Sequence, residues 1–167
     1  NYSDNELFTI LHVGRFERGK GVDTLLDAFS LLAKKYPNIH LLNIGPGQGA
    51  YLNKCKNRLN NESLLDRVTF AGFINYETLP VKYGNADLVV VPSEIYESFS
   101  YTVAQAMACG RAVIASQIGG IPETLGNGNN GLSFKPGNRE ELFEKIEGLY
   151  IDEKKRIYLG SKARDYA

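Results

Sequence analysis

Short runs of apolar and β-branched residues alternate with helical patterns along the chain, and this alternation constrains the fold most. Strands are predicted at residues 7–13, 39–44, 68–70, 88–91, 112–116 and 132–134. Helices are predicted between them at 22–35, 50–60, 78–83 and 101–109, and after them at 139–150 and 152–166. Strands that alternate with helices form βαβ units and a parallel sheet. We therefore predict a doubly wound, Rossmann-like α/β domain with about six parallel strands.

Composition limits the classes of partner. The 167 residues fit a single domain, and 19 Lys+Arg balance 19 Asp+Glu, so the net charge is zero. Such a chain has no overall field that would attract nucleic acid, and we predict no nucleic-acid partner. Cys55 and Cys109 are not spaced like metal ligands, and His12 and His40 stand alone. We read the two cysteines as buried thiols of a reducing cytosol, and we expect no metal or other cofactor.

The ends and the hydropathy of the chain indicate its relation to a longer protein and its cellular location. The only methionine is Met107, and the chain opens on polar residues directly before a strand, so we read residues 1–167 as an excised domain. No secretory leader is visible, and no apolar run approaches the roughly 20 residues of a membrane span. We expect a cytoplasmic protein.

The loops that follow the strands are where such a sheet binds ligands. The first loop, residues 14–21, combines glycines with two cations, Arg15 and Lys20. Glycines let the backbone approach a ligand, and the cations are charge-assisted donors. The loop contains neither the G-x-G-x-x-G nor the P-loop pattern, so neither dinucleotide binding nor P-loop chemistry is favoured. Taken alone, Arg15 and Lys20 are more often solvated surface charges.

The segment 91–110 carries the strongest functional signal. Glu97 stands just before a predicted helix start, and Gln105 follows eight positions later. Ser98 or Ser100 can cap the helix, whose first N–H groups form a positive end suited to phosphate. A carboxylate beside such a helix start can hold a sugar hydroxyl next to a phosphate. Glu94, three residues before Glu97, reads as a solvated carboxylate.

This segment resembles a family signature. P-S-E-I-Y-E-S-F-S-Y-T-V-A-Q-A-M-A-C-G is similar to P-S-x-x-E-G-F-G-x-x-x-x-E-A-M-A-x-G of the retaining nucleotide-sugar glycosyltransferases of family 4, also called group 1. Residues 14–21 resemble the family's G-R-x-x-x-x-K-G, 45–47 its G-x-G, and 119–123 its G-G-x-P-E. The motifs occur in the family's order from about residue 14 to 134. The resemblance implies the C-terminal, donor-binding half of a GT-B fold, whose N-terminal acceptor domain lies outside this chain.

The resemblance also implies roles for residues. Arg15 and Lys20 would hold the nucleotide diphosphate and Glu97 the sugar hydroxyls, and we take these three as the catalytic residues. Gln105 would contact the ribose in place of the family's second glutamate. The other expected donor-binding residues are Gly14, Gly45, Gly47, Phe73, Ile74, Ser98, Phe99, Ser100 and Tyr101. The implied reaction is metal-free transfer, with retention, from a UDP- or GDP-type sugar to a glycan or lipid-linked acceptor, in polysaccharide biosynthesis at or near a cytoplasmic membrane face.

Two alternatives stay open. Gln105 replaces a carboxylate, and Ser98 and Ser100 replace glycines that would be strained as serine if the loop needs positive φ. A degenerate, non-catalytic domain with the same fold is therefore the second hypothesis. A generic α/β binding module is the third, although it needs an acidic cluster at the first strand end, where Gly14 and Arg15 stand. For Phe73, a core position is as good a reading as a ligand contact, and a purely structural turn is equally plausible at 119–123.

Overall fold

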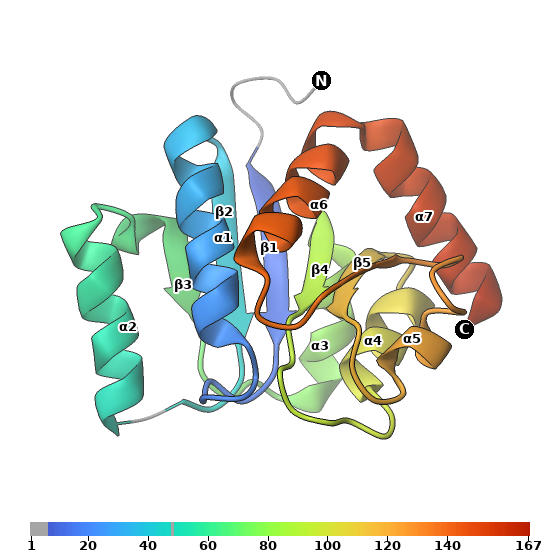
Figure 1. The fold of residues 1–167 in the computed structure, drawn as a ribbon, viewed down its shortest axis with the longest axis horizontal. Coiled ribbons are helices and arrows are strands. Elements are labelled where there is room, and N and C mark those ends of the chain that lie inside the picture. Colours follow the sequence, from blue (N-terminus) through green and yellow to red (C-terminus); the bar gives the residue numbers. More distant parts are fainter. Residues whose placement is uncertain (1–6, 48) are drawn as a thin grey trace.

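A single parallel sheet organises the molecule in the computed structural model, which describes residues 7–47 and 49–167 (Figure 1). Its strands are β1 (Phe8–Val13), β2 (Ile39–Ile44), β3 (Val68–Phe70), β4 (Leu88–Val91), β5 (Ala112–Ser116) and β6 (Leu132–Phe134), in the spatial order β3-β2-β1-β4-β5-β6. All the paired strands run parallel. The doubly wound sheet predicted from the sequence is confirmed, with strand boundaries that agree within one residue.

The helices lie close to their predicted positions. They are α1 (Val22–Lys35), α2 (Gly49–Asn61), α3 (Leu79–Gly84), α4 (Tyr101–Ala108), α5 (Ile121–Thr124), α6 (Arg139–Ile151) and α7 (Glu153–Tyr166). Two 3₁₀ turns, η1 (Leu65–Arg67) and η2 (Tyr76–Thr78), and the short helix α5 were not predicted. Each of these three is only one turn long, and such a segment is too short to show helical periodicity in a sequence. None of the described helices combines the length and the apolar character needed to cross a membrane.

Helices cover both faces of the sheet, which explains the fully apolar strands. Along β1, Ile10 packs into the cluster with α1, α2 and α6, whereas Leu11 packs on the other face with α3, α4, α5 and α7. In β4, every residue is buried for the same reason. The apolar stripe predicted for α1 is confirmed: Val22, Leu25, Leu26, Phe29, Leu32 and Ala33 are buried.

The sheet has one topological switch point, between β1 and β4. The chain winds outward from β1 to β3 and then returns to β4 on the other side of β1. The crossovers therefore leave β1 and β4 in opposite directions, and the loops that follow these two strands lead to helices on opposite faces of the sheet. Doubly wound sheets bind ligands at the carboxyl edge beside such a switch point. In Figure 1 this edge is at the bottom, below α1 and beside α4.

Candidate functional site

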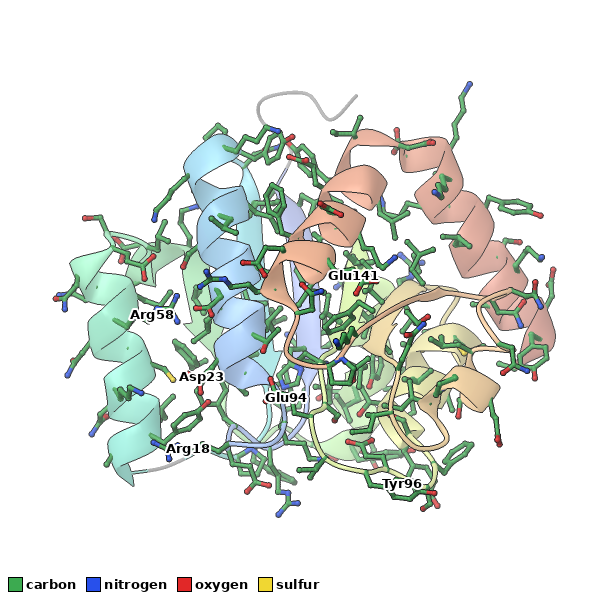
Figure 2. All side chains as sticks on the ribbon, viewed as in Figure 1. Arg18, Asp23, Arg58, Glu94, Tyr96 and Glu141 are labelled. Carbon is green, nitrogen blue, oxygen red and sulfur yellow. The ribbon has the colours of Figure 1, made fainter. Side chains whose placement is uncertain are left out.

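A cleft of about 400 Å³ lies at this switch point. Both loops predicted to carry chemistry line it: the first loop, after β1, and the fourth loop, which joins β4 to α4. The lining residues are His12, Val13, Gly14, Arg15, Lys20, Val91, Ser93, Tyr96, Glu97, Ser98, Phe99, Ser100, Tyr101 and Thr102. Figure 2 shows Tyr96 on the fourth loop at this edge of the molecule.

A carboxylate and an ammonium group meet inside the cleft. Lys20 Nζ donates a hydrogen bond to Glu97 Oε1 at 2.7 Å, and the two side chains are only 20% and 16% exposed. The Ser93 hydroxyl donates to the same carboxylate oxygen. Burial acts to raise the pKa of Glu97, but the hydrogen bonds from Lys20 and Ser93 outweigh it and lower the pKa below its ordinary value. Glu97 is therefore an ionised carboxylate at neutral pH.

Arg15 occupies a different position from Lys20. Its side chain is 62% exposed and pairs with Glu17 at 3.1 Å, an ion pair within the first loop. Solvent-exposed ion pairs of this kind contribute little stability. Of the two predicted cations, Lys20 is thus part of the cleft wall, while Arg15 stands at its mouth.

The start of α4 forms one wall of the cleft. Ser100 is the N-cap, and its hydroxyl accepts from the Val103 N–H at 3.5 Å. The first-turn N–H groups of a helix have no carbonyl partner within the helix, so this end carries partial positive charge. Ser100 has a φ of −104°. Ser98 is also outside the positive-φ region, which among described non-glycine residues holds only Ser63 and Asn127. The serines therefore introduce no backbone strain.

Glycines hold the loops of the cleft against one another. A Cβ on Gly21 would lie 1.7 Å from the Pro92 carbonyl oxygen, so the first loop packs directly on the fourth. Cβ atoms on Gly119 and Gly120 would lie 2.1 Å from the carbonyl oxygens of Glu97 and Ser98. The Gly120 N–H also donates to the Glu97 carbonyl at 2.7 Å. The glycines of the 119–123 motif thus allow a close approach within the protein, and they position the backbone of Glu97.

Glu94 further ties the fourth loop to α1. Its carboxylate accepts a hydrogen bond from the hydroxyl of buried Thr24 at 2.6 Å, and Figure 2 shows Glu94 near the start of that helix. Glu94 is exposed, as the interpretation of a solvated carboxylate expects, and the hydrogen bond from Thr24 is a contact that the sequence did not reveal.

Besides Gln105, four of the predicted donor-binding residues do not line the cleft. Gly45 and Gly47 line a separate hollow of about 60 Å³. Cβ atoms on these glycines would lie 1.9 Å from the Gly14 carbonyl oxygen and 2.5 Å from Phe16 Cβ, so both contact the first loop. Phe73 is 81% exposed, which makes the core reading of this residue wrong. Ile74 is half-buried against the cluster of α3 and α4.

Gln105 also lies outside the cleft. Its Oε1 accepts from the Tyr83 hydroxyl and its Nε2 donates to the Tyr76 hydroxyl, both at 3.2 Å. It lines a larger, mostly apolar hollow of about 580 Å³ between α4, α5 and the end of α7. We place the candidate site in the smaller polar cleft, because that is where Lys20, Glu97 and the start of α4 converge. The structure thus brings Gly14, Arg15, Lys20, Glu97 and Ser98 to Tyr101 together.

His12 is a cleft residue that sequence reasoning did not assign. It is 2% exposed, and its Nδ1 lies 3.3 Å from the Val90 carbonyl oxygen, to which it donates. Within the described part of the chain, Nε2 has no hydrogen-bond partner. Burial lowers the pKa of His12 to about 4, with Lys20 adding to this effect and the Val90 contact opposing it. The signal in the sequence was an ionisable residue placed between Leu11 and Val13 in a mostly apolar strand.

This histidine makes stability depend on pH. Its folded pKa of about 4 lies below the 6.5 of an unfolded chain, so the unfolded state takes up the proton first. Stability is complete above pH 6.5 and falls as the pH drops toward 4. Between pH 7 and 5 we expect His12 to account for a loss on the order of 2 kcal/mol. Urea denaturation of wild type and His12→Phe at both pH values should show this loss reduced in the variant. Equal losses in the two proteins would contradict a buried neutral imidazole.

A metal centre has no obvious location in residues 7–47 and 49–167. No group of three or more His, Cys, Asp and Glu side chains there could hold a metal ion.

Comparison with known proteins extends what the geometry indicates. The family model described as glycosyl transferases group 1 matches residues 2–166. Mannosylfructose-phosphate synthase of Agrobacterium fabrum is 35% identical over 139 residues, covering 80% of this chain and 30% of that protein. D-inositol 3-phosphate glycosyltransferase of Paenarthrobacter aurescens is 30% identical over 162 residues, covering 96% of this chain and 40% of the relative.

Solved structures agree with these relatives. Sucrose-phosphate synthase from Thermosynechococcus elongatus superposes with a TM-score of 0.86 and 35% identity, over 99% of this chain and 41% of that one. Anabaena HepE in complex with UDP and glucose gives a TM-score of 0.87 and 28% identity, over 97% of this chain and 44% of the other. The chain therefore spans less than half the length of each of these relatives.

Proposed function

The chain belongs to the group 1 glycosyl transferases, and from this premise we propose that it is the donor-binding domain of a retaining enzyme that uses a nucleotide-diphosphate sugar. The observation that carries the proposal is the pairing of Lys20 with Glu97 beside the start of α4. A cation and a helix N-terminus suit a diphosphate, and the adjacent carboxylate suits the hydroxyls of the attached sugar.

The proposed chemistry follows from charge. When the bond between the sugar and the diphosphate breaks, negative charge grows on the departing phosphate. Lys20 and the first N–H groups of α4 would stabilise that charge, which is usually the largest single contribution to catalysis. The departing phosphate would then take the proton of the incoming hydroxyl on the same face of the sugar. Glu97 would hold the sugar through its hydroxyls, and no protein nucleophile is needed in this half.

The proposed identity of the nucleotide and the proposed location of the acceptor site rest on different observations. HepE was solved with UDP and with UDP-glucose, which supports a UDP-type donor here, with GDP as the other candidate. The chain covers about two-fifths of most of the relatives named above, so the acceptor, a glycan or lipid-linked sugar, would bind largely to an N-terminal domain outside it. We expect the chain alone to bind nucleotide but to transfer little sugar.

A nucleotide screen tests the proposal. A ligand that binds only the folded state raises apparent stability in proportion to its occupancy. We expect thermal-shift and calorimetric titrations with UDP, GDP and ADP to show a clear preference for one nucleotide. The proposal fails if none of the three, nor their sugar conjugates, shifts the transition at millimolar concentration.

A degenerate domain is the second candidate. It is favoured by the position of Gln105, whose two polar ends are both engaged by tyrosines and which does not line the cleft. The same screen separates the candidates, because a domain that has lost its donor site should bind no nucleotide.

A further inference from the structure

The amide of Gln105, on α4, joins two tyrosines of the consecutive elements η2 and α3. Tyr83 on α3 is 1% exposed, while Tyr76 at the start of η2 is 67% exposed. The amide therefore connects a buried hydroxyl to one that faces solvent, at 3.2 Å on each side.

The direction of these hydrogen bonds follows from the chemistry of the three groups. Burial raises the pKa of Tyr83, so its hydroxyl keeps its proton and donates it to Gln105 Oε1. The amide NH2 group is a hydrogen-bond donor and not an acceptor, so it donates to the Tyr76 oxygen. Since that oxygen accepts, the proton of Tyr76 stays free for an outside acceptor. A carboxylate at position 105 would instead accept from both tyrosines and occupy that proton.

The place of Tyr76 connects it to the cleft. Gln105 lies one turn of α4 after Tyr101, and residues four apart share a helix face. Tyr101 and Thr102 line the cleft. Tyr76 reaches the same helix from the loop after β3, on the opposite side of β1 from the loop after β4. Tyr76 therefore bonds to α4 one helical turn beyond the cleft wall, in the direction in which a ligand held at Lys20 and the start of α4 would extend along that helix.

We propose that Tyr76 is a nucleoside-contacting residue, which donates its hydroxyl proton to an oxygen of the nucleoside, and that Gln105 sets this polarity. The inference rests on the proposed function, because the nucleoside must be attached to a diphosphate held in the cleft. In this proposal the amide of Gln105 has a function that a carboxylate could not perform, because it donates to Tyr76 and leaves the tyrosine proton available.

Calorimetry of Tyr76→Phe with UDP and with inorganic pyrophosphate tests the contact. The variant loses only the hydroxyl, and a neutral hydrogen bond corresponds to about a three- to tenfold change in affinity. We expect UDP binding to weaken by that factor while pyrophosphate binding stays unchanged. Tyr158→Phe, which removes a hydroxyl from a similarly exposed ring on α7, is the matched control and should bind both as wild type does.

UDP analogues locate the accepting oxygen. If the accepting oxygen belongs to the ribose, Tyr76→Phe should leave unchanged the affinity for the analogue that lacks the contacted 2′- or 3′-hydroxyl. If it belongs to the base, the weakening persists with both analogues. Either result supports the contact.

The role of Gln105 is tested by a double-mutant cycle with Gln105→Glu. Because the carboxylate takes the tyrosine proton, Tyr76→Phe should then cost nothing measurable in UDP affinity. An equal loss of UDP affinity on Tyr76→Phe in both backgrounds overturns the argument that Gln105 sets the direction of the hydrogen bond.

Unchanged UDP affinity of Tyr76→Phe in the wild-type background overturns the contact, and so does an equal loss with pyrophosphate. The proposed function stands in either case. Absence of UDP, GDP and ADP binding to wild type overturns both.

Discussion

Lys20→Ala is expected to weaken nucleotide binding about ten- to a hundredfold. Lys20 is the cation built into the cleft wall, and its side chain is only 20% exposed. A hydrogen bond to a charged group contributes roughly 1.5–3 kcal/mol, which corresponds to that range of affinity. Arg15→Ala should have the smaller effect, because Arg15 is 62% exposed and pairs with Glu17. Calorimetric titration of both variants with the preferred nucleotide measures the difference.

Lys34→Ala is the matched control. Lys34 is an exposed cation at the far end of α1 from the cleft, and its removal should leave nucleotide affinity unchanged. Because Lys20→Ala also takes away a partner of the Glu97 carboxylate, its free energy of unfolding should be measured beside its affinity. A folded Lys20→Ala variant that binds nucleotide as wild type does would refute the assignment of Lys20 to the diphosphate.

Gly21→Ala is expected to destabilise the protein by about 2–5 kcal/mol. Gly21 has a φ of 69°, a conformation that costs other residues roughly 1–2 kcal/mol. In addition, its new Cβ would lie 1.7 Å from the Pro92 carbonyl oxygen, so the first and fourth loops must separate. Overpacking of this kind adds about 1–3 kcal/mol. Urea denaturation measures the total.

Gly137→Ala separates the two costs. Gly137 has a similar φ of 76°, but nothing lies within 4 Å of the position of its Cβ. It should therefore show the conformational cost alone, and the excess loss in Gly21→Ala reports the contact between the loops. Equal destabilisation by the two substitutions would show that the loops do not pack as closely as described.

Much of the fold followed from local patterns. The alternation of apolar runs with helical stripes predicted the six strands and the long helices, because strand and helix periodicity are properties of neighbouring residues. The same holds for the loop motifs, which identified Lys20 and Glu97 before any contact between them was known. These residues are 77 positions apart, yet the rule that ligands bind at the carboxyl edge of the strands placed them together.

Details of the site depended on contacts that no local pattern encodes. The sequence could not show that Gly21 packs on Pro92, that Gly120 holds the backbone of Glu97, or that Glu94 bonds to Thr24. His12 was missed because its burial comes from the surrounding elements and not from its neighbours in sequence.

The sequence by itself determined the fold class, the family and the two loops that carry the charged residues. The tertiary structure alone decided that Lys20 is inside the cleft and Arg15 at its mouth, and that Gln105 lies between two tyrosines outside it. The physical reason is that periodicity and motifs arise from neighbouring residues, whereas the burial, pairing and hydrogen-bond direction of a side chain depend on what distant segments bring against it.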